Sequence, residues 1–430
     1  MHAIERTNSC GLKALLGDRE FAMSLRGIPS GFVGTRSTLV ALWLTLSGVA
    51  VIHLIGLGDA ARMGYFGQDF RPLWRAGMLT WLGENPWLPN PRFDSFIAYP
   101  PQTIPLLAVY GIFEWPAARL AQTTVSALCL ASLVLLAKRW FETEGGRVGM
   151  EGRATLPLTL TVLPLALVAL DTLASNVLAI GQTSLIVAAA SLWALEAARR
   201  QRFLLAGLLL AIASVKPQVS MAVALWFLFR REWRVLIPAM VVGAIMLLPA
   251  FVIWGPVTSV TSFIHSLGAY KTLDGAPLGG PDITGIPSVF VALGWPGGEI
   301  LGVLAGVAAF ALLLQYRDRL SPLLISQALI ALPLLALYGH AYDLAAIAIL
   351  WGYLILLGLR VRTPLALALV AGVLLLYHAP SYWATRADLG AFSQWRTVAV
   401  LLSWLVACFL ETALRAHSVA PKNGAADQSG

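Results

Sequence analysis

The segment FGQDFRPLWRAG (residues 66–77) places one carboxylate, Asp69, beside two arginines, Arg71 and Arg75, in a chain that carries little charge. A positioned carboxylate can act as a general base and take a proton from a hydroxyl group. From Phe70 onward, apolar residues recur at helical spacing, which predicts an amphipathic helix lying on a membrane surface. Aspartate is a preferred N-cap. The residues alone therefore favour a helix cap over a base.

A second candidate is Lys216, which precedes a proline between two short apolar runs, 203–215 and 217–229. Helices of this length reach about 20 Å, less than the ~30 Å hydrocarbon core of a bilayer. We therefore expect a hairpin whose tip carries the lysine below the outer surface. The lysine could bind a lipid phosphate or snorkel to the interface as an anchor. Gln182, in IGQTSL, could donate to the same phosphate or bond to another helix.

The segment GHAYD places His340 and Asp343 three residues apart, so on a helix they would share a face. They could contact a substrate or form a polar pair that closes a helix end, and the residues favour neither. A zinc site would need more ligands than the sequence places nearby. No cofactor is expected, because no DxD-like pair marks a site for a divalent metal.

Two further segments flank these candidates. AYPPQTIPLL contains Tyr99 and three prolines, which predict a short half-embedded segment over 98–113 that forms a wall beside Asp69. The segment 255–297 is rich in Gly and Pro, and its charges are expected to be those of an ordinary solvated loop. These charged residues are His265, Lys271, Asp274 and Asp282.

The elements that must position these residues are transmembrane helices. Of the 430 residues, 58% are apolar and 12% are charged, whereas soluble domains carry about 25% charged residues. The composition therefore predicts an all-α integral membrane protein with about twelve transmembrane helices. The expected spans are roughly 37–57, 115–137, 155–173, 179–197, 203–215, 217–229, 235–254, 298–315, 322–339, 344–360, 363–379 and 396–414.

Lysine and arginine gather in short loops such as RRQR and RREWR, and the positive-inside rule makes these loops cytoplasmic. The predicted organisation is a cytoplasmic arm (1–36), a polytopic domain (37–415) and a flexible cytoplasmic tail (416–430). Outer loops then cover about 58–114 and 255–297, and every candidate residue falls on the outer side. The net charge of +8 faces anionic membrane lipid, so nucleic acid is not an expected partner.

In this order and approximate spacing, several segments resemble glycosyltransferase family 87, a polytopic branch of the C-type glycosyltransferase superfamily. These segments are GQDFRPLWRAG, NPW, FIAYPP, IGQTSL, AGLLLAIASVKPQ and GHAYD. The resemblance covers about 37–360 and implies a C-type architecture whose outer loop carries interfacial helices. It also implies inverting transfer of a hexose, with mannose favoured, from a polyprenyl-phosphate donor. The acceptor would be a lipid-linked or cell-envelope glycan at the outer face of a bacterial inner membrane.

The resemblance assigns Asp69 as general base and Lys216 to the donor phosphate, and it leaves the roles of His340 and Asp343 less defined. Tyr99 and Gln182 match motif positions, and Arg71 and Arg75 are expected to contact donor or acceptor. A transporter or flippase of lipid-linked sugar is the alternative, because twelve spans and a broken hairpin suit it. The polar residues, however, gather on one side of the membrane. An envelope polymer ligase or polymerase ranks third.

Overall fold

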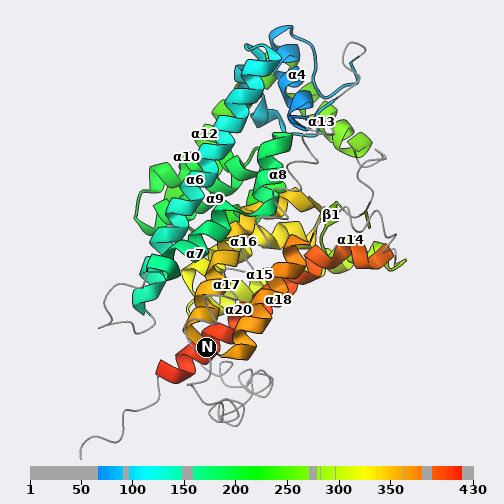
Figure 1. The fold of residues 1–430 in the computed structure, drawn as a ribbon. Helices are drawn as coiled ribbons and strands as arrows, with labels where there is room; N and C mark the ends of the chain where they lie inside the picture. The colour runs from blue at the N-terminus through cyan, green and yellow to red at the C-terminus, as the bar shows by residue number, and fades with distance from the viewer. Residues whose placement is uncertain are drawn as a thin grey trace, which may run out of the picture.

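The computed structural model describes residues 66–90, 96–147, 158–270, 278–280, 282–295, 297–361, 363–379 and 390–418. These residues form a long bundle of helices, with α4 and α13 at one end and α17, α18 and α20 extending toward the other (Figure 1). The predicted arm 1–36 and span 37–57 lie outside the described residues, as do Lys271 and Asp274 of the second outer loop. The predicted tail lies outside them after residue 418.

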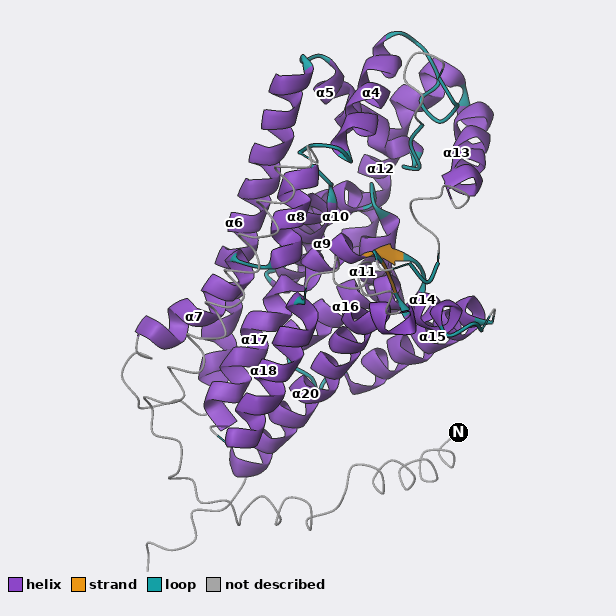
Figure 2. Ribbon diagram, turned by 45° about the vertical axis from the view of Figure 1, so that its right-hand side comes forward, coloured by secondary structure: helices purple, strands orange, loops and turns teal. Residues whose placement is uncertain are grey.

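The helices and strands follow the chain in the order α4 (Phe70–Trp81), η2 (Pro101–Thr103), α5 (Ile104–Gly111), α6 (Trp115–Arg147), α7 (Leu158–Ala169), α8 (Thr172–Ile180), α9 (Ser184–Arg199), α10 (Phe203–Ala213), α11 (Pro217–Phe229), α12 (Trp233–Trp254), α13 (Pro256–Tyr270), β1 (Ile283–Thr284), α14 (Ile286–Ala292), α15 (Gly298–Tyr316), α16 (Pro322–Ala336), β2 (Gly339–His340), η3 (Ala341–Ile347), α17 (Ala348–Val361), α18 (Pro364–His378), η4 (Gly390–Gln394) and α20 (Trp395–Ser418). Apart from one two-residue strand pair, which Figure 2 shows near α14, the regular elements of the described residues are helices.

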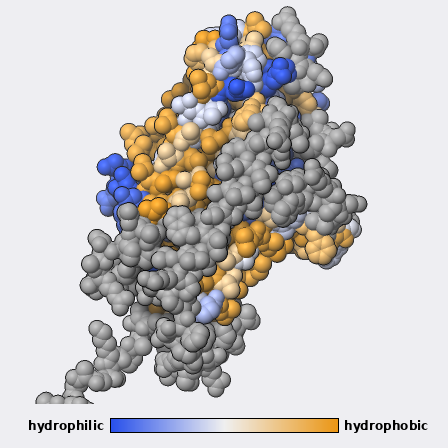
Figure 3. All heavy atoms as spheres, in the orientation of Figure 1, coloured by the Kyte–Doolittle hydropathy of each residue, from blue (hydrophilic) through white to orange (hydrophobic). Residues whose placement is uncertain are grey.

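The helices divide into a buried centre and an apolar outer layer. Within the described residues, five helices are long and apolar enough to cross a membrane, which makes the protein an all-α membrane protein but does not confirm about twelve spans. The segment Ala341–Val361 is 83% buried along its apolar window, whereas α12 is only 11% buried. Since an apolar face turned outward suits lipid, α12 belongs to the outer layer. Figure 3 shows apolar residues over much of the described surface.

The break expected at Lys216-Pro217, between two short helices, is confirmed, whereas its depth below the outer surface stays a prediction. The helices α10 and α11 end and begin on either side of the lysine, and Pro217 occupies the first position of α11. Proline is tolerated there, because the first residues of a helix have no partner for their N–H groups. The lysine is therefore fixed at the tip of two short helices.

The span expected over 155–173 ends early in the structure: α7 stops at Ala169, and a second, short helix, α8 (Thr172–Ile180), covers most of the expected connection to the next span. Asp171 causes the second helix to begin where it does, because its carboxylate accepts a hydrogen bond of 2.7 Å from the backbone N–H of Ala174. Asp171 is itself fully buried. Apolar composition extends across this junction, so hydropathy alone did not reveal the break.

The helices α4 and α5 cross at two glycines. A Cβ atom at Gly77 would stand 2.1 Å from the carbonyl oxygen of Leu107, and one at Gly111 would stand 2.3 Å from the carbonyl carbon of Gly77. These contacts are with backbone atoms, which cannot rotate away. The two helices can approach this closely only because neither glycine carries a side chain.

We expect Gly111→Ala to destabilise the protein by about 1–3 kcal/mol, because the new methyl group must push α5 away from α4. Thermal unfolding in detergent would measure the loss. Gly372→Ala in α18 is the matched control, since a Cβ there meets no atom within 4 Å and alanine favours helix. Equal melting temperatures for the two variants would show that the glycine crossing is not tightly packed.

Candidate active site

The turn that carries Asp69 is bound to the end of α8. The backbone N–H of Gly67 donates to the carbonyl of Ala179 at 2.7 Å, and the N–H of Asp69 donates to that of Ile180 at 3.1 Å. Gly181 ends α8 in the left-handed conformation with φ of 81°. These bonds fix the start of α4 against the residues that lead into the IGQTSL segment.

The Asp69 carboxylate is half-buried and accepts a hydrogen bond of 3.0 Å from Nε2 of Gln182. Within the described chain it makes no capping bond to α4, so its interpretation as a side-chain N-cap is wrong. The backbone at Asp69 is already helical, with φ of −78° and ψ of −19°, whereas a capping residue ordinarily has extended dihedral angles. The carboxylate is therefore directed toward Gln182 rather than toward its own helix.

Gln182 connects Asp69 to the rest of the site. Its Oε1 accepts from the Tyr99 hydroxyl at 2.9 Å and from Nζ of Lys216 at 3.5 Å. The Tyr99 hydroxyl also lies 3.1 Å from the hydroxyl of Thr183. Burial raises the pKa of Tyr99, so the phenol stays protonated and can donate. Because both ends of the Gln182 amide have partners, its orientation is fixed.

Lys216 is buried and paired. Its Nζ lies 2.5 Å from Oδ1 of Asp343 and 2.9 Å from the Ser184 hydroxyl, which itself donates to the same carboxylate oxygen at 2.6 Å. The side chains of Lys216 and Asp343 are 3% and 0% exposed, so Lys216 does not snorkel to the interface. The ammonium group is instead bound to a carboxylate, because a buried charge without a partner would be costly.

We refer to the linked side chains as the polar network; they are Asp69, Tyr99, Gln182, Ser184, Lys216 and Asp343. The network joins the first predicted outer loop, the start of α9, the hairpin tip and η3. Asp69, Gln182 and Lys216 were candidates on the same side of the membrane, and the structure brings them into contact.

His340 stands at the edge of this network. Its backbone pairs with Ile283 of β1, and the N–H of the next residue donates to the carbonyl of Asp282 at 2.7 Å. The His340 N–H donates to Oδ2 of Asp343 at 3.3 Å in a capping box that begins η3. The segment predicted as the second outer loop therefore contributes backbone to the site. Asp343 both closes a helix end, as one prediction had it, and binds Lys216.

Arg71 and Arg75 lie on α4 rather than in the polar network. Arg71 is exposed, and its guanidinium lies 6.0 Å from the ring centroid of Trp115. Burial and the nearby charge of Arg71 lower the pKa of Arg75. The structure thus places these two cations beside the network, on the helix that Asp69 precedes.

Four site residues were missed from the sequence. Ser184 follows the glutamine of IGQTSL by two residues, and Tyr338 and Tyr342 flank the histidine of GHAYD, so the motifs themselves contained a signal for these three. Tyr270 closes α13, and its hydroxyl lies 3.0 Å from Nε2 of His340. Nothing in the 255–297 segment distinguished this tyrosine, since its contact with His340 arises only when the loop folds back.

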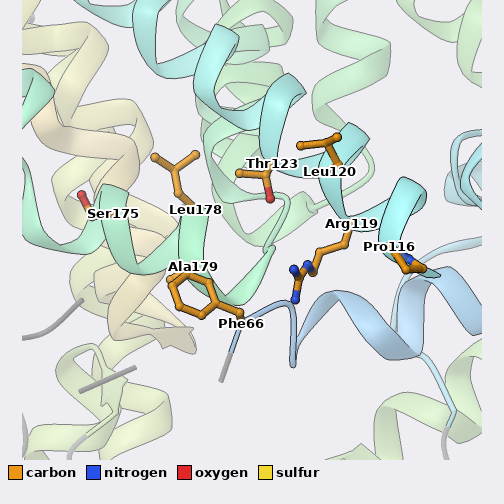
Figure 4. Close-up of a pocket in the computed structure, with 8 residues that line it drawn as sticks. All are labelled: Phe66, Pro116, Arg119, Leu120, Thr123, Ser175, Leu178 and Ala179. Atoms are coloured by element: carbon orange, nitrogen blue, oxygen red, sulfur yellow. The ribbon is translucent and has the colours of Figure 1, made fainter. Parts of the chain in front are cut away.

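A groove of about 390 Å³ lies beside the Asp69 turn, between α6 and α8 (Figure 4). It is lined by Phe66, Pro116, Arg119, Leu120, Thr123, Ser175, Leu178 and Ala179. None of these is a member of the polar network, so the groove is a neighbour of the network and not its interior. Across the described residues, no three His, Cys, Asp or Glu side chains gather as they would around a metal ion.

The apolar helices of this protein enclose the polar network, as is expected of a membrane protein with an internal polar site. The family model of glycosyltransferase family 87 matches residues 96–338, which is more than half of the chain. The protein belongs to this family and is therefore a membrane glycosyltransferase. No curated protein and no solved structure gives a significant match. The matched range contains Gln182 and Lys216, whereas Asp69 and Asp343 reach the site from outside it.

Proposed function

We propose that this glycosyltransferase moves a hexose, with mannose favoured, from a polyprenyl-phosphate donor to a lipid-linked or cell-envelope glycan. The observation that carries the proposal is the half-buried Asp69 carboxylate, which Gln182 fixes beside a buried ion pair. A polyprenyl phosphate stays in the bilayer, so an enzyme that uses it must present its base at the membrane surface. A carboxylate at the start of a helix that lies on that surface meets this requirement.

In the proposed reaction, Asp69 accepts the proton of an acceptor hydroxyl. The acceptor oxygen then forms a bond to the anomeric carbon of the sugar from the face opposite the phosphate. The bond between that carbon and the phosphate oxygen breaks, and its electron pair leaves with polyprenyl phosphate. The sugar is transferred with inversion, and the proton remains on Asp69 until it is released to water.

The other residues have separate proposed roles. Gln182 and Tyr99 hold Asp69 in place. Lys216 lies within electrostatic range of Asp69, but its pairing with Asp343 differs from the expectation of a lysine free to bind phosphate. We assign Lys216 and Asp343 as positioning residues for Gln182 and His340. The donor phosphate is assigned to the α4 cations, Arg71 and Arg75.

The proposed topology follows from the positive-inside distribution of Lys and Arg. Residues 1–36 and 416–430 are cytoplasmic, 37–415 form the membrane domain, and the loops 58–114 and 255–297 face the exterior of a bacterial inner membrane. Contacts of the Asp69 turn and of Tyr270 with the site support this arrangement, because each comes from a different outer loop. The site then faces the side where glycan acceptors are assembled.

The test is transfer of labelled hexose from synthetic polyprenyl-phosphate hexoses, with membranes containing the full chain and a lipid-linked glycan acceptor. We expect a covalent product from the polyprenyl donor and none from the corresponding sugar nucleotide. Product from the sugar nucleotide alone would overturn the proposal. Movement of labelled lipid across proteoliposomes without covalent product would support the flippase alternative.

We expect Gln182→Leu to lower kcat by about tenfold or more while the donor KM changes little, because a hydrogen bond to a charged group contributes about 1.5–3 kcal/mol. The variant removes the donor to Asp69 without touching the carboxylate. Gln315→Leu on the exposed side of α15 is the control. A changed KM with unchanged kcat would place Gln182 in substrate binding instead of in the positioning of Asp69.

A further inference from the structure

Three tyrosines surround His340, and with it they form what we call the aromatic wall: Tyr270, Tyr338, His340 and Tyr342. The rings of His340 and Tyr342 are parallel within 5°, with centroids 4.8 Å apart. Tyr338 and Tyr270 meet the imidazole edge-on, at 5.4 and 6.3 Å between centroids. The Tyr270 hydroxyl lies 3.0 Å from Nε2 of His340 and that of Tyr338 lies 3.5 Å from the same atom.

The aromatic wall adjoins the buried ion pair of Lys216 and Asp343, which we call the floor. Every ring of the wall is half-buried, whereas Lys216 and Asp343 are almost fully enclosed. Nζ of Lys216 stands 5.0 Å from the centroid of Tyr342, which joins wall to floor through a cation–π contact. Asp69 lies within electrostatic range of both Tyr270 and Tyr342. The carboxylate and the wall therefore belong to one polar region of the protein.

The wall is polar but carries no charge. Burial raises the pKa of Tyr270, so its phenol stays protonated. Burial lowers the pKa of His340, so its imidazole is neutral near pH 7. Lys216, the cation in contact with Tyr342, is already paired with Asp343. Uncharged hydroxyl and imidazole groups can both donate to and accept from a sugar hydroxyl, and they supply no positive charge to neutralise a phosphate.

We propose that the aromatic wall binds the pyranose ring of the transferred sugar and holds its anomeric carbon toward Asp69. Aromatic rings carry negative charge density and attract the C–H groups of a sugar ring. The Tyr270 hydroxyl uses one hydrogen-bonding position for Nε2 of His340 and keeps another for a sugar hydroxyl. This assignment rests on the proposed function and deepens it, because it separates sugar recognition from phosphate recognition on α4. Residues of the predicted second outer loop and of the β2–η3 segment then select the sugar.

The test compares binding of two ligands to the purified full chain in detergent: a polyprenyl-phosphate hexose and the same polyprenyl phosphate without sugar. We expect Tyr270→Phe, which keeps the ring and removes one hydroxyl, to weaken the hexose ligand about threefold to tenfold, as for one hydrogen bond. Tyr342→Leu, which removes a ring, should weaken it further. Binding of polyprenyl phosphate should be unchanged in both variants. Tyr316→Phe, at the far end of α15, is the control.

Two outcomes would overturn the aromatic wall as the sugar subsite. One is that Tyr270→Phe and Tyr342→Leu leave the ratio of the two affinities at its wild-type value; the other is that both ligands weaken equally. Failure of the proposed function has a different signature, namely that the wild-type protein itself transfers no sugar from any polyprenyl-phosphate donor. Wild-type transfer combined with an unchanged affinity ratio in the variants would reject the wall alone.

Discussion

Replacing Asp69 with asparagine should lower turnover by about 10²–10⁴-fold, because general base catalysis contributes an effect of this size. Asparagine has nearly the shape of aspartate, and its side-chain oxygen can still accept the hydrogen bond that Gln182 donates to the carboxylate. The turn that packs on α8 is held by backbone bonds, so it is unaffected. The loss should therefore fall on kcat, with donor binding largely retained, in an assay with labelled polyprenyl-phosphate hexose.

The control for Asp69→Asn is Glu299→Gln, which neutralises an exposed carboxylate in the first turn of α15. It changes the net charge by the same amount, and we expect turnover near wild type. Both variants should elute as folded protein with melting temperatures near that of the wild type. Near-normal turnover of Asp69→Asn would place the base elsewhere, and Asp343 would then be the carboxylate to test.

Much of the site could be anticipated because a membrane restricts where polar residues can stand. Once basic loops had set the orientation, Asp69, Lys216 and His340 all fell on one side. Two short apolar runs around a Lys-Pro pair were enough to predict the hairpin, since neither run could cross a bilayer alone. These inferences depended on length and charge, which are properties of the chain itself.

The partners of these residues could not be predicted in the same way. Helical periodicity assigns Asp69 to the start of α4, but it does not say that α4 packs on the end of α8, where Gln182 donates to the carboxylate. Pairing of Lys216 with Asp343 joins residues 127 positions apart. Contacts of this kind depend on which helices are neighbours, and one sequence holds little information on that.

The fold, like the site, could be predicted only in part from the sequence. Hydropathy located the apolar segments but not the interruption at Asp171, because a single buried carboxylate hardly alters the average over a window. Hydropathy also failed to predict the secondary structure within 255–297. There α13, β1 and α14 form from residues whose composition resembles that of a loop. For this reason the sequence did not identify Tyr270 as a site residue, although its hydroxyl contacts His340.

Breaking the buried ion pair should have the largest effect on stability. Lys216→Met leaves the Asp343 carboxylate, which is 0% exposed, without its cation. Asp343→Asn leaves the Lys216 ammonium, which is 3% exposed, without its anion. Removing one partner of a buried pair costs about 3–5 kcal/mol, because the remaining charge is uncompensated. Each single variant should therefore melt well below the wild type in detergent.

The double variant, Lys216→Met with Asp343→Asn, separates stability from activity. It contains no uncompensated charge, and the new side-chain amide oxygen can still accept from the Ser184 hydroxyl, so most of the lost stability should return. Turnover should stay at least about tenfold low, because Gln182 loses a donor and an energy of about 1.4 kcal/mol corresponds to tenfold. A fully active double variant would show that the ion pair contributes to stability and not to turnover. A raised donor KM with unchanged kcat would instead assign Lys216 to the donor phosphate, because a residue that only positions Asp69 would change kcat.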